Sequence, residues 1–139
     1  MRPVADAGHR EGGCLCGRIR YRAAEPLTAI TICHCTECRA TSGGTPAHTS
    51  CAADGFALTA GAGELRWFPG PTSETGGERG FCPTCGSYLL FRIDGDARMY
   101  LTAGSLDDAA GIPFDTHIWW ASRAPWEAPD GRPTLERYD

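Results

Sequence analysis

The sequence predicts a mainly β protein. Glycine (18 residues) and proline (10 residues) interrupt the 139-residue chain so often that a long helix has no room to form. Short runs of β-type residues lie between these breaks. Seven of the eight cysteines fall into three tight clusters with the spacing of metal ligands. We expect a flexible N-terminal segment over residues 1–12, followed by a single domain over residues 13–139.

Seven segments have the character of strands. Residues 17–23 alternate apolar Ile19 and Tyr21 with arginines, the period-two pattern of a strand with one buried face. The other six alternate less strictly and span residues 28–33, 56–59, 64–68, 87–93, 98–102 and 116–120. Two helical turns are expected, over residues 37–40 and residues 105–109. In the second, Ser105 can cap the turn and two aspartates suit its start.

Composition and charge exclude several function classes. All 13 basic residues are arginine, so Schiff-base chemistry on a lysine is excluded. The net charge of −4 would fall to about −7 if seven thiolates bound two zinc ions, so nucleic acid is not expected as a partner. No stretch approaches the ~20 apolar residues of a membrane span. Residues 1–13 hold no apolar run typical of an export signal, so we expect a cytoplasmic chain with zinc sites in place of disulfides.

The cysteine spacing is that of zinc ligands. The clusters are Cys14-x-Cys16, Cys33-x-Cys35-x-x-Cys38 and Cys82-x-x-Cys85. Thiolates one or two residues apart can both reach an ion about 2.3 Å away, whereas such close neighbours rarely reach disulfide geometry. Pro83 and Gly86 favour a tight turn around the last cluster, a zinc knuckle whose backbone N–H groups can face the sulfurs.

Counting favours one way of sharing these ligands. Pairing the first cluster with the last gives a closed four-cysteine site, typical of structural zinc, and leaves three sulfurs and a vacancy, typical of catalytic zinc. A redox Cys-x-x-Cys of the thioredoxin type is the alternative at residues 35–38 and 82–85, although it leaves the other clustered cysteines without a role. Cys51 stands alone and is expected to be a small buried residue, with a fourth metal ligand as the alternative.

With these motifs in place, the sequence resembles the glutathione-dependent formaldehyde-activating (GFA) family, whose members include centromere protein V. The resemblance runs from Gly12 to about Tyr138. It is carried by the segments Gly13-Cys14-Leu15-Cys16-Gly17, Cys33-His34-Cys35-Thr36-Glu37-Cys38-Arg39, Phe81-Cys82-Pro83-Thr84-Cys85-Gly86-Ser87, His117-Ile118-Trp119 and Asp130-Gly131.

The resemblance implies a fold, two zinc ions and an activity. The implied fold is Mss4-like, similar to that of the small zinc-binding exchange factor for Rab GTPases, with several small antiparallel β-sheets organised around zinc sites. The implied ligands are Cys14, Cys16, Cys82 and Cys85 on a structural zinc and Cys33, Cys35 and Cys38 on a catalytic zinc. The implied activity is that of a carbon–sulfur lyase of the S-(hydroxymethyl)glutathione synthase type, which adds glutathione or a similar thiol to formaldehyde or another small electrophile.

Such a reaction needs a proton donor for the electrophile's oxygen, and His34, His48 and His117 are the candidates. His34 lies between two ligands and is expected to point to solvent, while His117 is expected to be a buried supporting residue. Arg39 is a candidate contact for an anionic substrate.

Three alternative functions stay open. A non-catalytic zinc-binding interaction module would need a fourth ligand at the Cys33 cluster. A thiol–disulfide or methionine sulfoxide reductase would work without the second metal. A guanine-nucleotide exchange module, like the protein whose fold is implied, would need an exposed partner surface.

Overall fold

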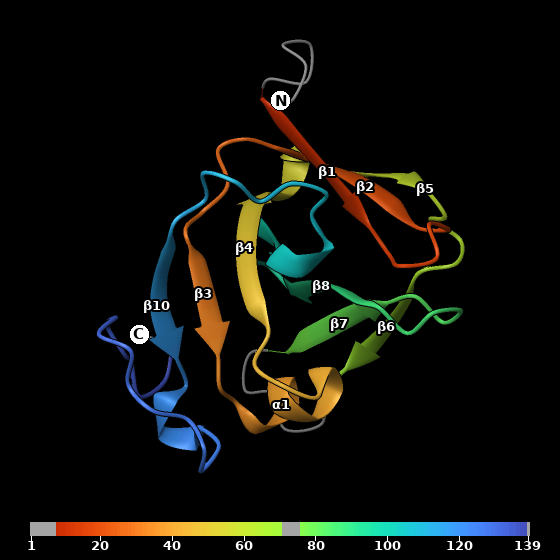
Figure 1. The fold of residues 1–139 in the computed structure, drawn as a ribbon. Helices are drawn as coiled ribbons and strands as arrows, with labels where there is room; N and C mark the ends of the chain where they lie inside the picture. Colours follow the sequence, from red (N-terminus) through yellow and green to blue (C-terminus); the bar gives the residue numbers. More distant parts are fainter. Residues whose placement is uncertain (1–7, 71–75, 139) are drawn as a thin grey trace.

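A computed structural model describes residues 8–70 and 76–138 and has the expected mainly β fold (Figure 1). Three strands form an antiparallel sheet in the order β1-β2-β5: β1 (His9–Gly13), β2 (Arg20–Ala24) and β5 (Phe56–Ala60). A larger sheet of seven strands has the order β10-β3-β4-β9-β8-β7-β6. Its strands are β3 (Ile30–Cys33), β4 (Ala47–Ala52), β6 (Arg66–Pro69), β7 (Gly77–Phe81), β8 (Tyr88–Ile93), β9 (Arg98–Thr102) and β10 (Phe114–Ile118).

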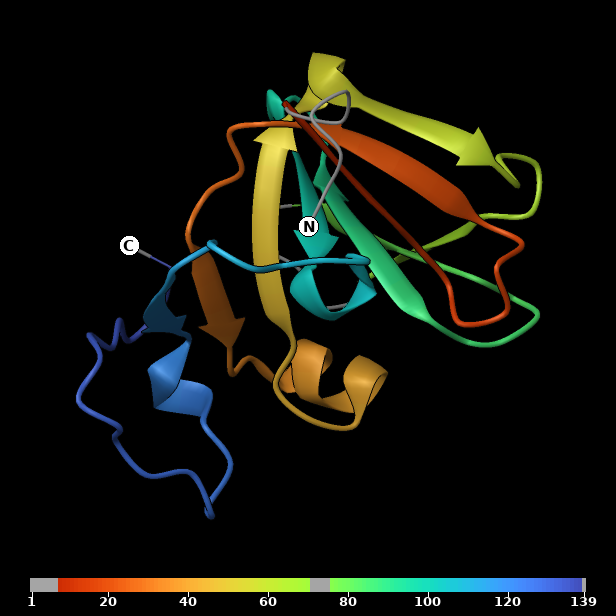
Figure 2. The same cartoon turned by 45° about the horizontal axis from the view of Figure 1, so that its top comes forward.

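The pairing in the larger sheet places the late strand β10 beside the early strand β3. Strand β10 runs parallel to β3, with Ile118 opposite Cys33, and the other neighbouring strands of this sheet pair antiparallel. In both views the C-terminal segment lies beside β10, on the far side of the molecule from the three-stranded sheet (Figures 1 and 2). A late segment of the chain therefore supports the loop that carries the Cys33 cluster.

All seven predicted strand segments contain strands, but three strands were missed. Strands β1 and β7 have the sequences HREGG and GERGF, whose glycines and charges hide the β pattern. Strand β4, AHTSCA, combines small and polar residues, three of which are nonetheless buried. The expected flexible segment of residues 1–12 needs a correction, because residues 9–12 pair with β2 as part of β1. Residues 1–7 lie outside the described part of the chain.

One of the two expected helical turns is present. Helix α1 (Thr36–Ser42) includes residues 37–40; its N-cap is Cys35, and Gly43 ends it with a φ of 74°. The turn predicted over residues 105–109 is wrong, since a 3₁₀ turn spans Ala103–Ser105 and ends there. The Ser105 hydroxyl instead donates to the Thr102 carbonyl oxygen (2.8 Å) and meets the Tyr21 hydroxyl (2.6 Å).

The core lies between the three-stranded sheet and strands β4, β8 and β9. Its fully buried members include Ile19, Tyr21, Leu89, Leu90 and Leu101. Strand β4 runs from the helix α1 end of the molecule to the end covered by the three-stranded sheet (Figure 1). The core occupies the latter end, which leaves the α1 end for the Cys33 cluster and the side chains around it.

Candidate metal centres

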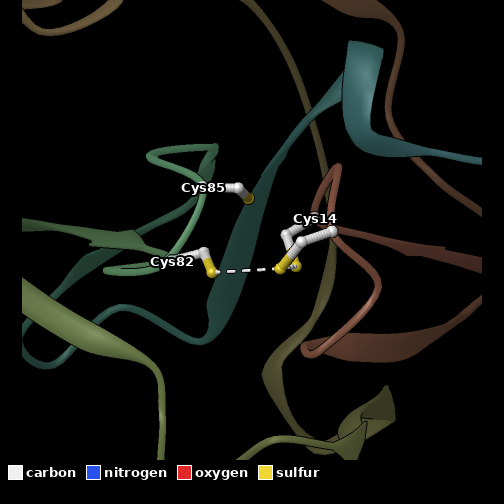
Figure 3. Close-up of side chains that lie close together, drawn as sticks. Cys14, Cys82 and Cys85 are labelled. Carbon is white, nitrogen blue, oxygen red and sulfur yellow. Dashed lines mark hydrogen bonds between the residues drawn. The ribbon is translucent and has the colours of Figure 1, made fainter.

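Four cysteines from two distant turns meet at one point (Figure 3). Cys14 and Cys16 lie between β1 and β2, whereas Cys82 and Cys85 lie between β7 and β8. Their four sulfurs lie within 4.8 Å of one another, with 3.6 Å between Cys14 and Cys16 and 3.8 Å between Cys16 and Cys82. Four sulfurs placed tetrahedrally about 2.3 Å from a zinc ion are about 3.8 Å apart. The arrangement therefore fits a four-thiolate zinc site.

Backbone N–H groups orient the Cys14 thiol and close the turn that carries Cys82 and Cys85. The N–H of Ile19 donates to Sγ of Cys14 (3.3 Å), and the N–H of Gly86 closes the Cys82 turn on the Cys82 carbonyl oxygen (2.8 Å). Gly86 has a φ of 79°, as the zinc-knuckle prediction required. A hydrogen bond with the Ser87 hydroxyl (3.2 Å between Sγ and Oγ) lowers the pKa of Cys85 to about 5. This thiol is thus largely ionised at neutral pH.

The second cluster forms where β3 passes into α1. Cys33 ends β3, Cys35 caps α1 and Cys38 lies in its first turn, which brings the three sulfurs within 4.8 Å of one another. The N–H of Cys38 donates to Sγ of Cys35 (3.2 Å). Hydrogen bonds from the thiols of Cys33 and Cys38 lower the pKa of Cys35 to about 2, whereas the same hydrogen bonding raises the pKa of Cys33.

A cavity of about 600 Å³ opens onto the second cluster and not onto the first. Its lining consists of Thr31, Cys33, Cys35, Thr36, Glu37, Cys38, His48, Arg79, Tyr88, Phe91, Ile93, Asp96, Tyr100, Ile118, Trp119, Ser122 and Tyr138. Trp119 has a φ of 55°, and its ring packs against Tyr138 with 5.7 Å between the centroids. The three-cysteine cluster thus forms part of the wall of a space large enough for a small molecule.

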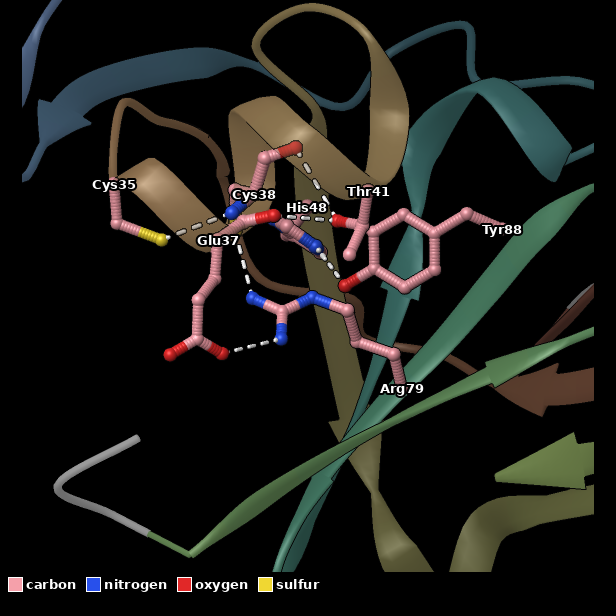
Figure 4. Close-up of polar contacts among 7 residues, drawn as sticks. All are labelled: Cys35, Glu37, Cys38, Thr41, His48, Arg79 and Tyr88. Carbon is pink, nitrogen blue, oxygen red and sulfur yellow. Dashed lines mark hydrogen bonds and ion pairs between the residues drawn. The ribbon is translucent and has the colours of Figure 1, made fainter. Parts of the chain in front are cut away.

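Arg79 is the charged residue at this site that sequence reasoning missed (Figure 4). Its guanidinium donates to Sγ of Cys38 (3.3 Å) and to Oε1 of Glu37 (3.1 Å), and its side chain is buried. Burial alone would lower its pKa, but the hydrogen bond to Cys38 and the nearby thiols raise it, so the guanidinium stays charged. Because Arg79 lies in β7, which itself escaped prediction, no local pattern marked it. Arg39, the candidate contact for an anionic substrate, does not line the cavity.

His48 and Tyr88 form a hydrogen-bonded pair in the cavity wall. His48 Nε2 lies 2.8 Å from the Tyr88 hydroxyl, and the two rings meet edge to face. Burial, assisted by the charge of Arg79, lowers the pKa of His48 to about 4. Burial, together with the thiol of Cys38, raises the pKa of Tyr88. At neutral pH, His48 is therefore uncharged and Tyr88 keeps its proton.

His34 and His117 lie behind the cluster, away from the cavity. The expectation that His34 faces solvent is wrong, because its side chain is fully buried. Its Nε2 lies 2.9 Å from Nδ1 of His117, whose Nε2 lies 2.9 Å from Oδ2 of Asp130, and both rings pack against Trp120. The parallel strand β10 presents His117 to this position, so a long-range pairing withdraws His34 from solvent. His117 has the buried supporting place expected of it.

Cys51 joins neither cluster. It is fully buried within the hydrophobic core, so its expected role as a small apolar residue is confirmed and the fourth-ligand alternative is wrong. Among the described residues, the group around Cys33 contains three ligands.

The fold and these clusters define a small β protein with two cysteine clusters that could each hold a metal ion. More particularly, the chain belongs to the glutathione-dependent formaldehyde-activating enzyme (GFA) family, whose model matches residues 9–122. No curated protein matches the chain. A crystal structure of a Rhodobacter sphaeroides protein has a similar fold, with a TM-score of 0.59 and 21% identity over 75% of this chain and 98% of that one. Within the described ranges, no helix is both long and apolar enough to span a membrane.

Proposed function

We propose that this protein is a carbon–sulfur lyase-like enzyme that joins a small thiol, such as glutathione, to formaldehyde or another small electrophile. The observation that carries the proposal is the difference between the two clusters. The Cys33, Cys35 and Cys38 sulfurs line a cavity of about 600 Å³, whereas the four sulfurs of the other cluster do not. Family membership supports the choice of a thiol and formaldehyde as the reactant classes.

The residues of the second cluster suit a zinc ion with one free position. A zinc ion held by three thiolates lowers the pKa of a thiol that takes the fourth position, which supplies a nucleophile at neutral pH. The chain orients its own ligands for this: the N–H of Cys38 points at Sγ of Cys35, and Arg79 donates to Sγ of Cys38. Arg79 also forms an ion pair with Glu37, the residue before Cys38.

The first cluster is proposed to be structural. Cys82 is fully buried and Cys14 nearly so, and the cluster joins the turn after β1 to the turn after β7. A zinc ion on Cys14, Cys16, Cys82 and Cys85 would hold the three-stranded sheet against the larger one.

The site geometry favours this function over a non-catalytic interaction module. Such a module would need a closed second site, and the described residues supply no fourth cysteine, histidine or carboxylate to the Cys33 group. The reductase alternative differs in its metal requirement, because a reductase would use the thiols of the Cys33 cluster directly and would need no zinc ion at that cluster.

The test combines zinc content with the rate of adduct formation. Wild type, Cys35→Ser and Cys51→Ala would be purified without oxygen, analysed for zinc, and followed by NMR for thiol–formaldehyde adduct above the spontaneous rate. Two zinc ions and a catalysed rate are expected in wild type and in Cys51→Ala, the control for loss of a buried cysteine outside the clusters. Cys35→Ser should keep one zinc ion and lose the rate.

Two outcomes would contradict the proposal. Two zinc ions without a catalysed rate on any thiol would indicate an interaction module. Thiol-dependent reduction of a disulfide or a methionine sulfoxide by protein lacking the second zinc ion would indicate a reductase.

A further inference from the structure

We propose that Tyr88 is the catalytic residue that gives a proton to the electrophile's oxygen, and that His48 is a positioning residue that orients the Tyr88 hydroxyl. The inference deepens the proposed function and rests on it. Its basis is the place of this pair in the cavity wall, where the Cys33, Cys35 and Cys38 sulfurs also lie.

Three neighbouring strands hold the pair in place. His48 of β4 is the register partner of Thr102 of β9, and the Thr102 hydroxyl donates to the Tyr88 carbonyl oxygen (2.9 Å). His48 Nε2 then lies 2.8 Å from the Tyr88 hydroxyl. Figure 4 shows this hydroxyl pointing to His48 on the side where Arg79 and Cys38 lie. The phenol is thus directed at the cluster by contacts to the middle of the larger sheet.

A β-bulge gives Tyr88 its position. The pairing of β7 with β8 places Gly80 opposite Leu90 but Phe81 opposite Tyr88, so one extra residue, Leu89, enters β8. Without the bulge, Leu89 would follow Phe91 and Ile93 on the cavity face, since alternate residues share a face. With it, Leu89 turns into the core, where it is fully buried, and Tyr88 lines the cavity. Because of the bulge, the cavity wall carries the Tyr88 hydroxyl at this position in place of the apolar Leu89 side chain.

Other described groups in the cavity wall are less suited to give the proton. The Tyr100 hydroxyl donates to Oδ2 of Asp96 (2.8 Å), which engages its proton. Tyr138 is 51% exposed at the rim. Thr31, Thr36 and Ser122 carry aliphatic hydroxyls, which are much weaker acids than a phenol. His34 and His117 are absent from the lining, so neither reaches the cavity.

The protonation states of the pair suit this role. Neutral His48 can donate its Nε2–H to the Tyr88 oxygen, which leaves the phenol proton free to point into the cavity. Burial disfavours the phenolate that forms when the proton leaves, and the same N–H and the nearby positive charge of Arg79 partly offset this effect. His48 therefore acts through Tyr88 and does not itself exchange a proton with the substrate.

The proposed step balances without an oxidant or reductant. An electron pair on the substrate sulfur forms the new C–S bond, and the C=O π pair moves to oxygen. That oxygen takes the proton of Tyr88, and the phenolate is reprotonated by the proton that the thiol released. The sum is thiol plus formaldehyde giving the S-hydroxymethyl adduct. In the reverse direction the Tyr88 phenolate takes the adduct's hydroxyl proton.

The test replaces only the hydroxyl. Tyr88→Phe would be compared with wild type and with Tyr21→Phe, which removes another buried hydroxyl from the core far from the cavity. We expect kcat to fall about 100-fold or more in both directions in Tyr88→Phe, with zinc content and calorimetric thiol binding unchanged. The solvent deuterium isotope effect of the wild type should disappear. Tyr21→Phe should keep the wild-type kcat and isotope effect.

The role of His48 has its own readout. Glutamine can place an amide N–H near the position of Nε2, so His48→Gln should keep most of the rate while His48→Phe loses it. Wild-type kcat and isotope effect in Tyr88→Phe would overturn this inference and leave the proposed function intact, as would equal rates in His48→Gln and His48→Phe. Absence of a catalysed rate in zinc-loaded wild type would overturn both.

Discussion

The guanidinium of Arg79 donates to Sγ of Cys38 over 3.3 Å, so that a strand from the middle of the chain supports a ligand on the first helix. The same guanidinium binds Glu37, the residue before Cys38, and this second contact fixes the orientation of the first. A buried cation beside a thiolate stabilises its negative charge and restricts where the sulfur points.

Replacing Arg79 by methionine should therefore weaken the second zinc site alone. We expect an affinity loss of about 10- to 100-fold at the Cys33 cluster, which is typical for the loss of a residue that orients a ligand. Competition with a chromophoric chelator would measure this. Arg92→Met is the matched control, because Arg92 lies on the neighbouring strand and stacks over Trp67 at 3.7 Å without reaching either cluster. Equal affinities in the two variants would contradict the role of Arg79.

The two clusters should differ in their effect on stability. Cys82→Ser removes a buried ligand from the site that joins the turns of β1–β2 and β7–β8, whereas Cys35→Ser affects one loop beside a cavity. We expect Cys82→Ser to cost more than about 3 kcal/mol, which lowers the Tm by roughly 10 °C or more, and Cys35→Ser to lower it by a few degrees. Thermal unfolding of the zinc-loaded proteins measures both. A larger loss in Cys35→Ser would reverse the assignment of structural and catalytic sites.

The sequence predicted each cysteine cluster because the signal of a cluster is local, whereas the meeting of the first cluster with the last was inferred by counting ligands. Two cysteines one or two residues apart must lie close in any fold, and Gly86 marks the turn that one pair needs. The arrangement of Arg79, His48 and Tyr88 has no such signal. It depends on two unpredicted strands and on a bulge at Leu89, and these arise from pairing between strands that are distant in the sequence.

His34 shows the same limit of local sequence patterns, because the pattern predicted the direction of its side chain but not what surrounds it. Alternation along an extended backbone places its side chain opposite to its neighbours Cys33 and Cys35, and this part of the prediction agrees with its absence from the cavity wall. What lies on that opposite side depends on β10, which pairs with β3 from more than 80 residues away and presents His117. A single strand pattern cannot distinguish solvent from a partner strand.

The lowered pKa of His48 predicts a pH-dependent stability. Its pKa is about 4 in the folded protein against 6.5 when unfolded, so between these values the unfolded chain binds more protons and the free energy of unfolding rises with pH. The contribution is at most about 1.4 kcal/mol per pH unit within this window, is complete above pH 6.5 and is lost as the pH falls toward 4.

Urea unfolding of wild type and His48→Gln at pH 4.5 and pH 7.5 measures this contribution. Zinc loss at low pH affects both proteins, so the difference between them isolates His48, and a pH-independent difference would contradict the assignment.

The contact between His117 and Asp130 links the C-terminal segment to the second metal site. With the Asp130 carboxylate accepting from His117 Nε2, the opposite nitrogen of that ring accepts from His34, which lies between two ligands. The hydrogen bond from His117 lowers the pKa of Asp130, so the carboxylate accepts throughout the neutral range. Asp130→Leu leaves the buried His117 N–H without its acceptor, whereas Asp130→Asn still offers a carbonyl oxygen.

We therefore expect Asp130→Leu to lower the Tm by about 5 °C and to weaken zinc binding at the Cys33 cluster, while the four-cysteine site keeps its affinity. Asp130→Asn should stay close to wild type in both measurements. Scanning calorimetry and chelator competition on the three proteins test this. If Asp130→Leu loosened both sites equally, the effect would be one of general stability, and the two histidines would not connect Asp130 to the ligands.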